Sequence, residues 1–464
     1  MPSAEPRIAP TEVVGSGLCI GCGGCASRAP QGAATMAFDG KGLLSPRGRS
    51  AWMEAPSPSL ARTCPFSPHA RDEDRIAAER FPLAAWRDEH VGRFEAAYVG
   101  HVAEGEYRAR GSSGGLTNWT AAELLRLGLV DGVAHVGRLP GPAADEPLFG
   151  YRISRSLEDL SQGAMSRYYP VELSRVLAEI RATPGRYAII GVPCFIKAVH
   201  LLRAEEPVLA ERIAFTLGLF CGHMKSAHMA ESFAWQLDAP FEDVRRFDHR
   251  IKDPSRPANW YAARAELADG QERRGDWWHF ADGDWGAGFF QAPACDWCDD
   301  VTAETADIAF GDAWLEPYSS DGWGTNVVVV RSPVVHDLVR AAIAEGRLSL
   351  EAVDADFVRR TQAAGFRHRR EGLAYRLTWR KRGLRPRKRV RPGAAHLTPR
   401  RKAVYRMRRH ITVWSHRLFG LSRRIGRPGL YLRWARMELA VYRALAWSHG
   451  RLGAWFDRWE KRAV

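Results

Sequence analysis

The sequence predicts an α/β protein, with a mixed α+β sheet domain between a cysteine-rich N-terminal segment and a basic helical tail. Three observations predict this class. Short apolar runs typical of strands alternate with helical segments between residues 95 and 363. Four of the eight cysteines lie before residue 65, and acidic residues become rare after residue 366. We therefore divide the chain into residues 1–80, 90–365 and 367–464.

The composition bounds the class of protein. The chain has 464 residues, of which 45% are hydrophobic, which is enough for two or three domains with real cores. No apolar run reaches about 18 residues, so no transmembrane helix is expected. The first ten residues lack the apolar stretch of a secretory signal. Eight cysteines in such a chain are more typical of metal ligands than of disulfides, and we expect a cytoplasmic protein.

The positive charge is confined to the C-terminal fifth of the chain. The formal net charge is +14, but residues 367–464 carry 29 Lys and Arg against 4 Asp and Glu. The remaining residues carry 38 bases and 49 acids, a balance of −11. The high pI therefore does not mark the whole protein as a nucleic-acid binder.

The first three cysteines have the spacing of a cluster-binding loop. Cys19, Cys22 and Cys25 form a C-x2-C-x2-C run, which can place three thiolates around one face of an iron–sulfur cubane. Three glycines in this run permit left-handed backbone and expose N–H groups to the sulfurs, namely Gly21, Gly23 and Gly24. The run predicts a ferredoxin-like iron–sulfur segment.

The fourth ligand of this site must lie farther along the chain. Bacterial ferredoxin runs end in C-x3-C-P, whereas this chain has Ala29 followed by Pro30. Cys64 is the next cysteine and the predicted fourth ligand. A structural zinc site remains the alternative, because zinc also binds four thiolates.

A loop of small residues leads into a predicted helix. The loop is Gly111-Ser112-Ser113-Gly114-Gly115, followed by Leu116 and Thr117, and the helix is expected over 121–127. Backbone N–H groups at such a junction suit a phosphate or pyrophosphate. The loop is neither a Walker A nor a G-x-G-x-x-G motif, and an ordinary N-capped helix is the alternative.

The remaining cysteines lie beside predicted strands or aromatic residues. Strands are expected at 95–103, 130–137, 187–190, 213–220, 306–314 and within 322–330, and helices at 71–80, 171–182, 226–237, 334–345 and 355–363. Cys194 and Cys221 each follow a strand, where α/β folds place their sites. Cys295 and Cys298 form a C-x2-C pair beside several Trp and Phe residues. With these, the chain holds two groups of four thiols.

The tail is predicted to form two basic amphipathic helices, over 398–418 and 428–462. Their aromatic and arginine residues suit an anionic membrane surface or an acidic protein. Alternatively, their apolar stripes pack on the body and the arginines are solvated. No named RNA-binding motif is present, so a nucleic-acid partner is not expected.

Taken together, these motifs resemble the coenzyme F420 hydrogenase/dehydrogenase beta-subunit family. The resemblance covers about residues 15–340, excludes the tail, and is carried by the cysteine run at 19–25 and the segments 111–115, 128–133, 166–168, 191–194, 218–223, 295–298 and 306–314. It implies an FAD- and iron–sulfur-dependent oxidoreductase. Coenzyme F420, a tetrapyrrole vinyl group and a saccharide-linked intermediate are candidate substrates, and a ferredoxin-like protein is a candidate electron donor or acceptor.

The resemblance also implies site residues. Cys19, Cys22, Cys25 and Cys64 would bind one 4Fe–4S cluster, and Cys194, Cys221, Cys295 and Cys298 the other. The loop Gly111–Gly115 with Thr117, and Ser166, Arg167 and Tyr168, would bind FAD, although Arg167 and Tyr168 could simply pack. Lys252 matches an R-x-K position near the flavin and is the predicted catalytic residue.

Two other classes of function stay open at this stage. One is a non-catalytic electron-transfer subunit that needs a partner enzyme. The other is a zinc-stabilised binding protein whose tail docks on a membrane or on RNA. Metal and flavin analysis separates these hypotheses from the oxidoreductase.

Overall fold

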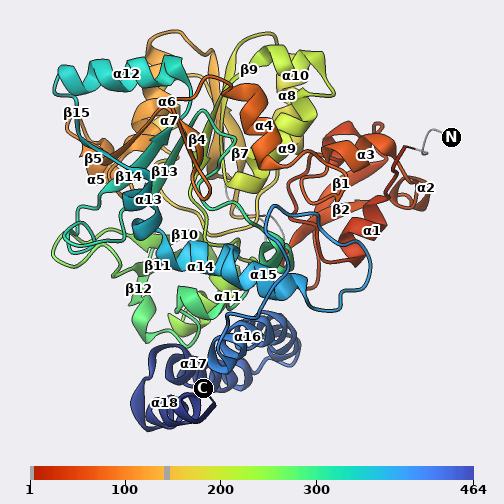
Figure 1. Ribbon diagram of the computed structural model, residues 1–464, viewed down its shortest axis with the longest axis vertical. Coiled ribbons are helices and arrows are strands. Elements are labelled where there is room, and N and C mark those ends of the chain that lie inside the picture. Colours follow the sequence, from red (N-terminus) through yellow and green to blue (C-terminus); the bar gives the residue numbers. More distant parts are fainter. Residues whose placement is uncertain (1–4, 140–146, 464) are drawn as a thin grey trace.

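The chain folds into an α/β body with a small N-terminal segment on one side and a bundle of C-terminal helices below it (Figure 1). The computed structural model describes residues 5–139 and 147–463. The predicted α/β class and the helical C-terminal region are confirmed. The domain boundaries at residues 80, 90 and 365 remain predictions.

The main sheet has eight strands within the described residues and is mixed. Its four central strands run parallel, whereas the three strands at one edge and the single strand at the other pair antiparallel. In spatial order the strands are β15 (Leu348–Val353), β5 (Ala96–Val102), β14 (Asn326–Val330), β13 (Ile308–Asp312), β9 (Ile213–Leu219), β8 (Tyr187–Gly191), β6 (Gly132–Arg138) and β7 (Phe149–Ser154).

Both faces of this sheet are covered, which explains why its central strands are almost purely apolar. Successive side chains of a strand point to opposite faces, so Ala188 and Ile190 of β8 join one core while Tyr187 and Ile189 join the other. The first core is closed by α6 and α12, and the second by α8, α9 and the N-terminal segment. The helices around this sheet are α5 (Tyr107–Arg110), α6 (Leu116–Arg126), α7 (Leu157–Ser161), α8 (Ser174–Ala182), α9 (Pro193–Arg203), α10 (Pro207–Arg212) and α12 (Pro333–Ala344).

The N-terminal segment is made of short elements that dock on the second core. Leu18, Ile20, Leu60 and Phe66 are buried there against α8 and α9. Whether the segment is ferredoxin-like and binds a cluster stays a prediction. Its elements are α1 (Pro10–Gly15), η1 (Ala26–Arg28), the hairpin β1 (Ala34–Phe38) and β2 (Leu44–Gly48), α2 (Ser50–Met53), α3 (Pro58–Thr63), α4 (Glu73–Arg80), and the hairpin β3 (Trp86–Asp88) and β4 (Gly92–Phe94).

A second, three-stranded antiparallel sheet was not predicted. Its first strand reads Val-Arg-Arg-Phe-Asp-His-Arg-Ile, and so many charged residues hide the strand signal in the sequence. The sheet packs against α11 and so extends the body toward the C-terminal helices. Its elements are α11 (His228–Gln236), η2 (Phe241–Asp243), β10 (Val244–Ile251), β11 (Ala262–Leu267) and β12 (Glu272–Asp276), followed by η3 (Trp277–His279), η4 (Trp285–Ala287) and η5 (Pro293–Trp297).

The C-terminal helices pack on the body with their apolar faces. Phe419 and Tyr431 are fully buried, and Phe419 stacks on Trp235 of α11 with ring centroids 4.3 Å apart. The apolar faces of these helices therefore pack on the body, which is one of the two alternatives that the sequence left open. The helices are α13 (Ala355–Thr361), α14 (Ala363–Arg369), α15 (Glu371–Leu377), α16 (Pro399–Arg424), α17 (Pro428–Trp447) and α18 (Gly450–Ala463).

The structure corrects four expectations about helices, the first of which is that the helix expected over 398–418 continues to Arg424. The helix expected over 121–127 begins at Leu116, because Gly115 in left-handed backbone (φ 88°) already caps it. A helix, α9, begins at Pro193, where only a loop was expected, and proline is favoured in the first turn. The second tail helix is two helices, because Ser448 adopts left-handed backbone (φ 56°) and ends α17.

Replacing Phe419 with alanine is expected to destabilise the protein by about 3–5 kcal/mol, because the fully buried ring contacts Trp235, Phe290 and Tyr431. Chemical denaturation of the full chain measures this. The control is Trp447→Ala, since that side chain is 60% exposed and its loss should change stability by no more than about 0.5 kcal/mol. Equal effects of both substitutions would show that the tail does not pack on the body in solution.

Candidate functional site

The first cysteine quartet gathers from two separate segments. Cys19, Cys22 and Cys25 lie on the loop between α1 and η1, and Cys64 is the C-cap residue of α3. The loop is held on the body by the N–H of Leu173, which donates to the carbonyl of Cys22 at 2.9 Å. Burial raises the pKa of the Cys19 thiol to about 12, and the Cys64 thiolate adds to that rise. The four thiols are therefore close neighbours in a poorly solvated place.

Backbone amides beside these sulfurs oppose part of the effect of burial on the pKa values. Burial raises the pKa of each thiol, whereas the amides of Gly21, Gly24 and Ala26 lower the pKa of the three loop cysteines and those of Phe66 and Ser67 lower the pKa of Cys64. Such donors stabilise negative charge on sulfur.

The loop glycines partly follow the prediction. Gly21 and Gly23 adopt left-handed backbone, with φ 69° and 78°. A Cβ on Gly21 would also lie 2.5 Å from the carbonyl oxygen of Leu44. Gly24 does not use the left-handed backbone that a glycine permits.

The second quartet gathers at one edge of the main sheet. Parallel strands β8 and β9 are neighbours, so their carboxyl ends meet, and Cys194 and Cys221 follow them. The loop that carries Cys295 and Cys298 is held beside them, because the N–H of Cys221 donates to the carbonyl of Val301 at 3.0 Å. The N–H of Met224 donates to the Cys295 sulfur at 3.3 Å.

Burial again raises the pKa of these thiols, to about 11 for Cys221 and about 12 for Cys295. The thiolates of Cys298, Cys221 and Cys295 each raise the pKa of Cys194, which places all four close together. All eight cysteines are free thiols. Across residues 5–139 and 147–463, no three His, Cys, Asp or Glu side chains are arranged to hold a single metal ion.

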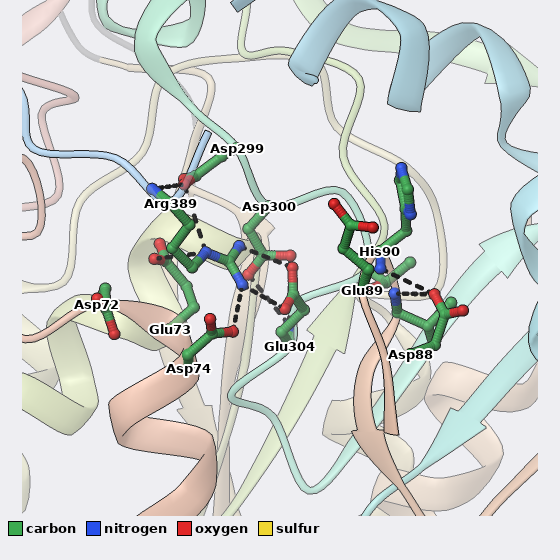
Figure 2. A network of polar contacts seen from close by, with 12 residues as sticks. Asp72, Glu73, Asp74, Asp88, Glu89, His90, Asp299, Asp300, Glu304 and Arg389 are labelled. Carbon is green, nitrogen blue, oxygen red and sulfur yellow. Dashed lines mark hydrogen bonds and ion pairs between the residues drawn. The ribbon is translucent and has the colours of Figure 1, made fainter. Parts of the chain in front are cut away.

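A network of charged side chains surrounds Arg389 (Figure 2). Its centre is Arg389, which pairs with Glu304 and Asp299 and reaches Asp74 of α4 at 2.9 Å. Lys388 donates to Asp299 at 3.1 Å and lies 4.9 Å above the ring of Phe66. Phe66 follows Cys64 by two residues, and Asp299 follows Cys298. A segment that the sequence assigned to a solvated tail thus lies between the two thiol groups.

A cleft of about 560 Å³ lies beside the small-residue loop and is lined by many cations. Its volume is in the range of small-molecule sites. The lining cations are Arg110, Arg138, Arg152, Arg167, Arg246, Arg250 and Lys252. Four carboxylates pair with these cations: Asp248 with Arg138, Arg167 and Arg246, Asp312 with Arg250, Asp159 with Arg152, and Glu266 with Arg246. The seven cations of the lining still outnumber these four carboxylates. The cleft therefore favours anionic ligands.

Six of the predicted flavin-site residues come together at this cleft. Gly111, Arg167 and Lys252 line it. The N–H of Ser166 donates to the Ser112 hydroxyl at 2.9 Å, and Lys252 Nζ donates to the Ser113 carbonyl, also at 2.9 Å. Lys252 thus holds the loop through main-chain carbonyls, which the sequence did not indicate.

The other four predicted residues lie apart from the cleft lining. Gly114 packs against β5 and β14, where a Cβ would lie 2.8 Å from the Gly100 carbonyl oxygen. Gly115 caps α6, and Thr117 is half-buried in its first turn. The first N–H of α6, on Leu116, already donates to the Asn326 side chain. Tyr168 turns inward instead.

Tyr168 starts a row of aromatic side chains, half-buried at Tyr168 and Trp285 and buried at His223, that leads toward the second quartet. Its ring centroid lies 4.8 Å from that of Trp285, which stacks on His223 at 4.4 Å. His223 follows Cys221 by two residues. Of the aromatic residues expected beside Cys295 and Cys298, Trp278 is exposed, and Phe289 and Phe290 contact the tail helices instead.

Two profiles of the family "Coenzyme F420 hydrogenase/dehydrogenase, beta subunit" match the sequence. Residues 97–178 match the profile of its N-terminal part, and residues 185–356 match the profile of its C-terminal part. The chain belongs to this family. The matched residues contain the small-residue loop, the cleft and the second quartet. The first quartet and all residues after 356 lie outside them.

A solved structure with a similar fold is a chain of the F420-reducing [NiFe] hydrogenase complex from Methanosarcina barkeri, described as a xenon derivatization. The similarity has a TM-score of 0.49 at 18% identity, and it covers 65% of this chain and 99% of that chain. No curated protein matches the chain.

Replacing Lys252 with methionine is expected to remove a pH-dependent step in anion binding. Burial and the charges of Arg108 and Arg250 lower the pKa of Lys252 to about 8. The cleft of this family member therefore loses a positive charge as the pH rises through that value, or slightly above it when an anion is bound.

Titration calorimetry with inorganic pyrophosphate, from about pH 6.5 to about pH 9.5, tests this. In the wild type the affinity for pyrophosphate should fall severalfold as the pH rises through about 8. In K252M the affinity should be lower, and it should stay nearly constant across the same pH range. The control is K41M, because Lys41 is exposed on the β1–β2 turn, and it should keep the step. A K252M protein that keeps the step would contradict the assignment.

Proposed function

We propose that this chain is an oxidoreductase that uses FAD and two 4Fe–4S clusters. Its family comprises redox subunits by name. The observation that supports the proposal is that the eight free cysteines are all partly or fully buried, and that six of them belong to or pack against the core shared by α8, α9 and the N-terminal segment. Buried thiols with raised pKa values become stable as thiolates only beside positive charge, which bound iron supplies.

The donor sets fit the implied groups. Cys19, Cys22, Cys25 and Cys64 would hold one cluster, with amides aimed at their sulfurs. Cys194, Cys221, Cys295 and Cys298 would hold the other. When bound, the clusters carry single electrons, and the flavin exchanges either single electrons or a hydride.

The cationic cleft fits the phosphate groups of FAD. Gly111, Ser112, Ser113, Ser166 and Arg167 meet there, and Gly114, Gly115 and Thr117 fix the turn into α6. Burial lowers the pKa of Arg167 to about 10, so this guanidinium stays charged at neutral pH. Lys252 holds the loop and adds charge, so we propose it as a residue that positions the anionic ligand. Tyr168, Trp285 and His223 exclude water between the cleft and the second quartet.

Coenzyme F420, after which the family is named, is the proposed substrate. A ferredoxin-like protein is the proposed electron donor or acceptor.

The decisive experiment is the iron, sulfide, zinc and flavin content of anaerobically purified protein. We expect about eight irons and one FAD per chain. Cys64→Ser and Cys298→Ser form a matched pair, and each should lose about four irons while keeping the cluster of the other quartet. Zinc without flavin would refute the proposal, as would a C64S protein that keeps all its iron. Bound cofactors without turnover of F420 would assign the chain to electron transfer alone.

We also propose that the outer surface of the C-terminal helices lies against an anionic membrane. Eight of the sixteen large apolar side chains exposed within the described residues lie in residues 399–463, seven of them in α16–α18 and one, Ile425, between α16 and α17, and they include Trp447 at 60% and Trp455 at 51%. Exposed Arg424, Arg427 and Arg433 lie near the turn between α16 and α17. Exposed aromatic and aliphatic side chains beside arginine suit the headgroup region of anionic lipid. No helix in the part that the structure describes is long and apolar enough to span a bilayer.

Flotation with vesicles of phosphatidylcholine, with and without about 30% phosphatidylglycerol, tests this proposal. We expect the full chain to float with anionic vesicles only, and less so at high salt. Reversing Arg424, Arg427 and Arg433 to Glu should reduce binding at least fivefold. The control reverses Arg47, Arg49 and Arg87, which are exposed on the body, so the net charge changes equally. Equal flotation of both triple variants would refute a specific lipid-facing surface.

A further inference from the structure

Arg369 is a buried arginine with unsatisfied hydrogen-bond donors. It is the last residue of α14 and is 1% exposed. Its Nη2 donates to the carbonyl of Gly222 at 2.8 Å. Its Nε and Nη1 have no hydrogen-bond partner. A buried guanidinium with two unpaired N–H groups is costly, so an acceptor for them is expected.

The charges around Arg369 are those of the second quartet. Burial opposes its charge, but the thiolates of Cys298, Cys221, Cys295 and Cys194 outweigh burial and raise the pKa of Arg369. In return, the arginine lowers the pKa of each of these thiols. Gly222, which anchors the guanidinium, is the neighbour of Cys221. The two free donors therefore lie where the thiols gather.

The main chain around Arg369 is fixed by the same loop that carries two of the thiols. In the next helix, α15, the fully buried Arg376 donates from Nε to the carbonyl of Asp296 at 2.7 Å. Asp296 lies between Cys295 and Cys298, so α14 and α15 are clamped on the C-x2-C pair. The main chain that carries Arg369 is therefore held in place against the loop of Cys295 and Cys298.

We propose that Arg369 is a positioning residue of the second iron–sulfur cluster, to which its two free N–H groups donate and whose reduction its charge favours. The inference rests on the proposed function, because it needs the quartet to hold a cluster. It goes beyond that function because Arg369 lies after residue 356, where the family match ends. The C-terminal extension thereby completes the redox site.

The physical effect follows from charge. Reduction adds an electron to the cluster, and a nearby buried cation stabilises the added charge more than water would. Removing the cation must therefore lower the reduction potential of this cluster. The other cluster, in the N-terminal segment, should be unaffected.

The test is a redox titration of the full-length protein followed by electron paramagnetic resonance, together with iron analysis. In R369Q we expect the reduction equilibrium of one cluster to shift at least tenfold toward the oxidised form, about 59 mV for one electron. R369K keeps the charge and should recover most of the shift. The matched control is R370Q, because Arg370 pairs with Glu304 at 3.3 Å and is the adjacent residue.

Each outcome decides the inference. Loss of about four irons in R369Q but not in R369K would also support it, because the quartet would then need the cation to hold its cluster. An unchanged potential and iron content in R369Q would overturn it. Loss of both clusters in R369Q and R369K alike would overturn it as well, since Arg369 would then serve the fold in general. A wild-type protein without a second cluster would instead show that the proposed function has failed.

Discussion

Thiolate charge is the constraint on which much of this structure depends. Eight thiols are packed into two poorly solvated groups, and burial raises the pKa of every one of them. Four thiolates can share such a space only if positive charge and N–H donors surround them. Loop amides supply the donors at the first quartet, and Arg369 supplies a cation at the second. Lys388 and Arg389 neutralise the carboxylates that fill the space between the quartets.

The strand order of the main sheet brings the second quartet and the cleft close to each other. Because β8 and β9 are parallel neighbours, residues 194 and 221 meet although 26 residues separate them. The chain that leaves β9 leads to His223, and from there the aromatic row reaches Tyr168, which follows the cleft residue Arg167. A parallel centre thus places a thiol site and an anion-binding cleft within reach of one another. This proximity makes electron transfer between them physically reasonable, whichever substrate the cleft accepts.

The sequence predicts those parts of the site that depend on local signals. Cysteine spacing, a missing fourth cysteine at Ala29 and apolar runs before Cys194 and Cys221 are all visible without coordinates. Arg369, Lys388 and Arg389 could not be found in this way, because a buried arginine and a solvated one look alike within a run of basic residues. The one signal in the sequence was the density of arginine at 367–370, soon after the family match ends at residue 356. The second sheet was hidden for a related reason, since its strands carry ion-paired arginines where apolar residues were expected.

The basic C-terminal region therefore cannot be given one role on the basis of its charge. Arg369, Arg376, Lys388 and Arg389 are buried and face thiols, a main-chain carbonyl or carboxylates inside the body. Arg424, Arg427 and Arg433 face outward beside exposed apolar side chains. Cutting the chain before residue 369 would remove both sets at once, so loss of lipid binding in a truncated protein would be confounded by damage to the redox site. Only point substitutions in the full chain can separate the role of the buried basic residues at the redox site from the role of the exposed arginines in lipid binding.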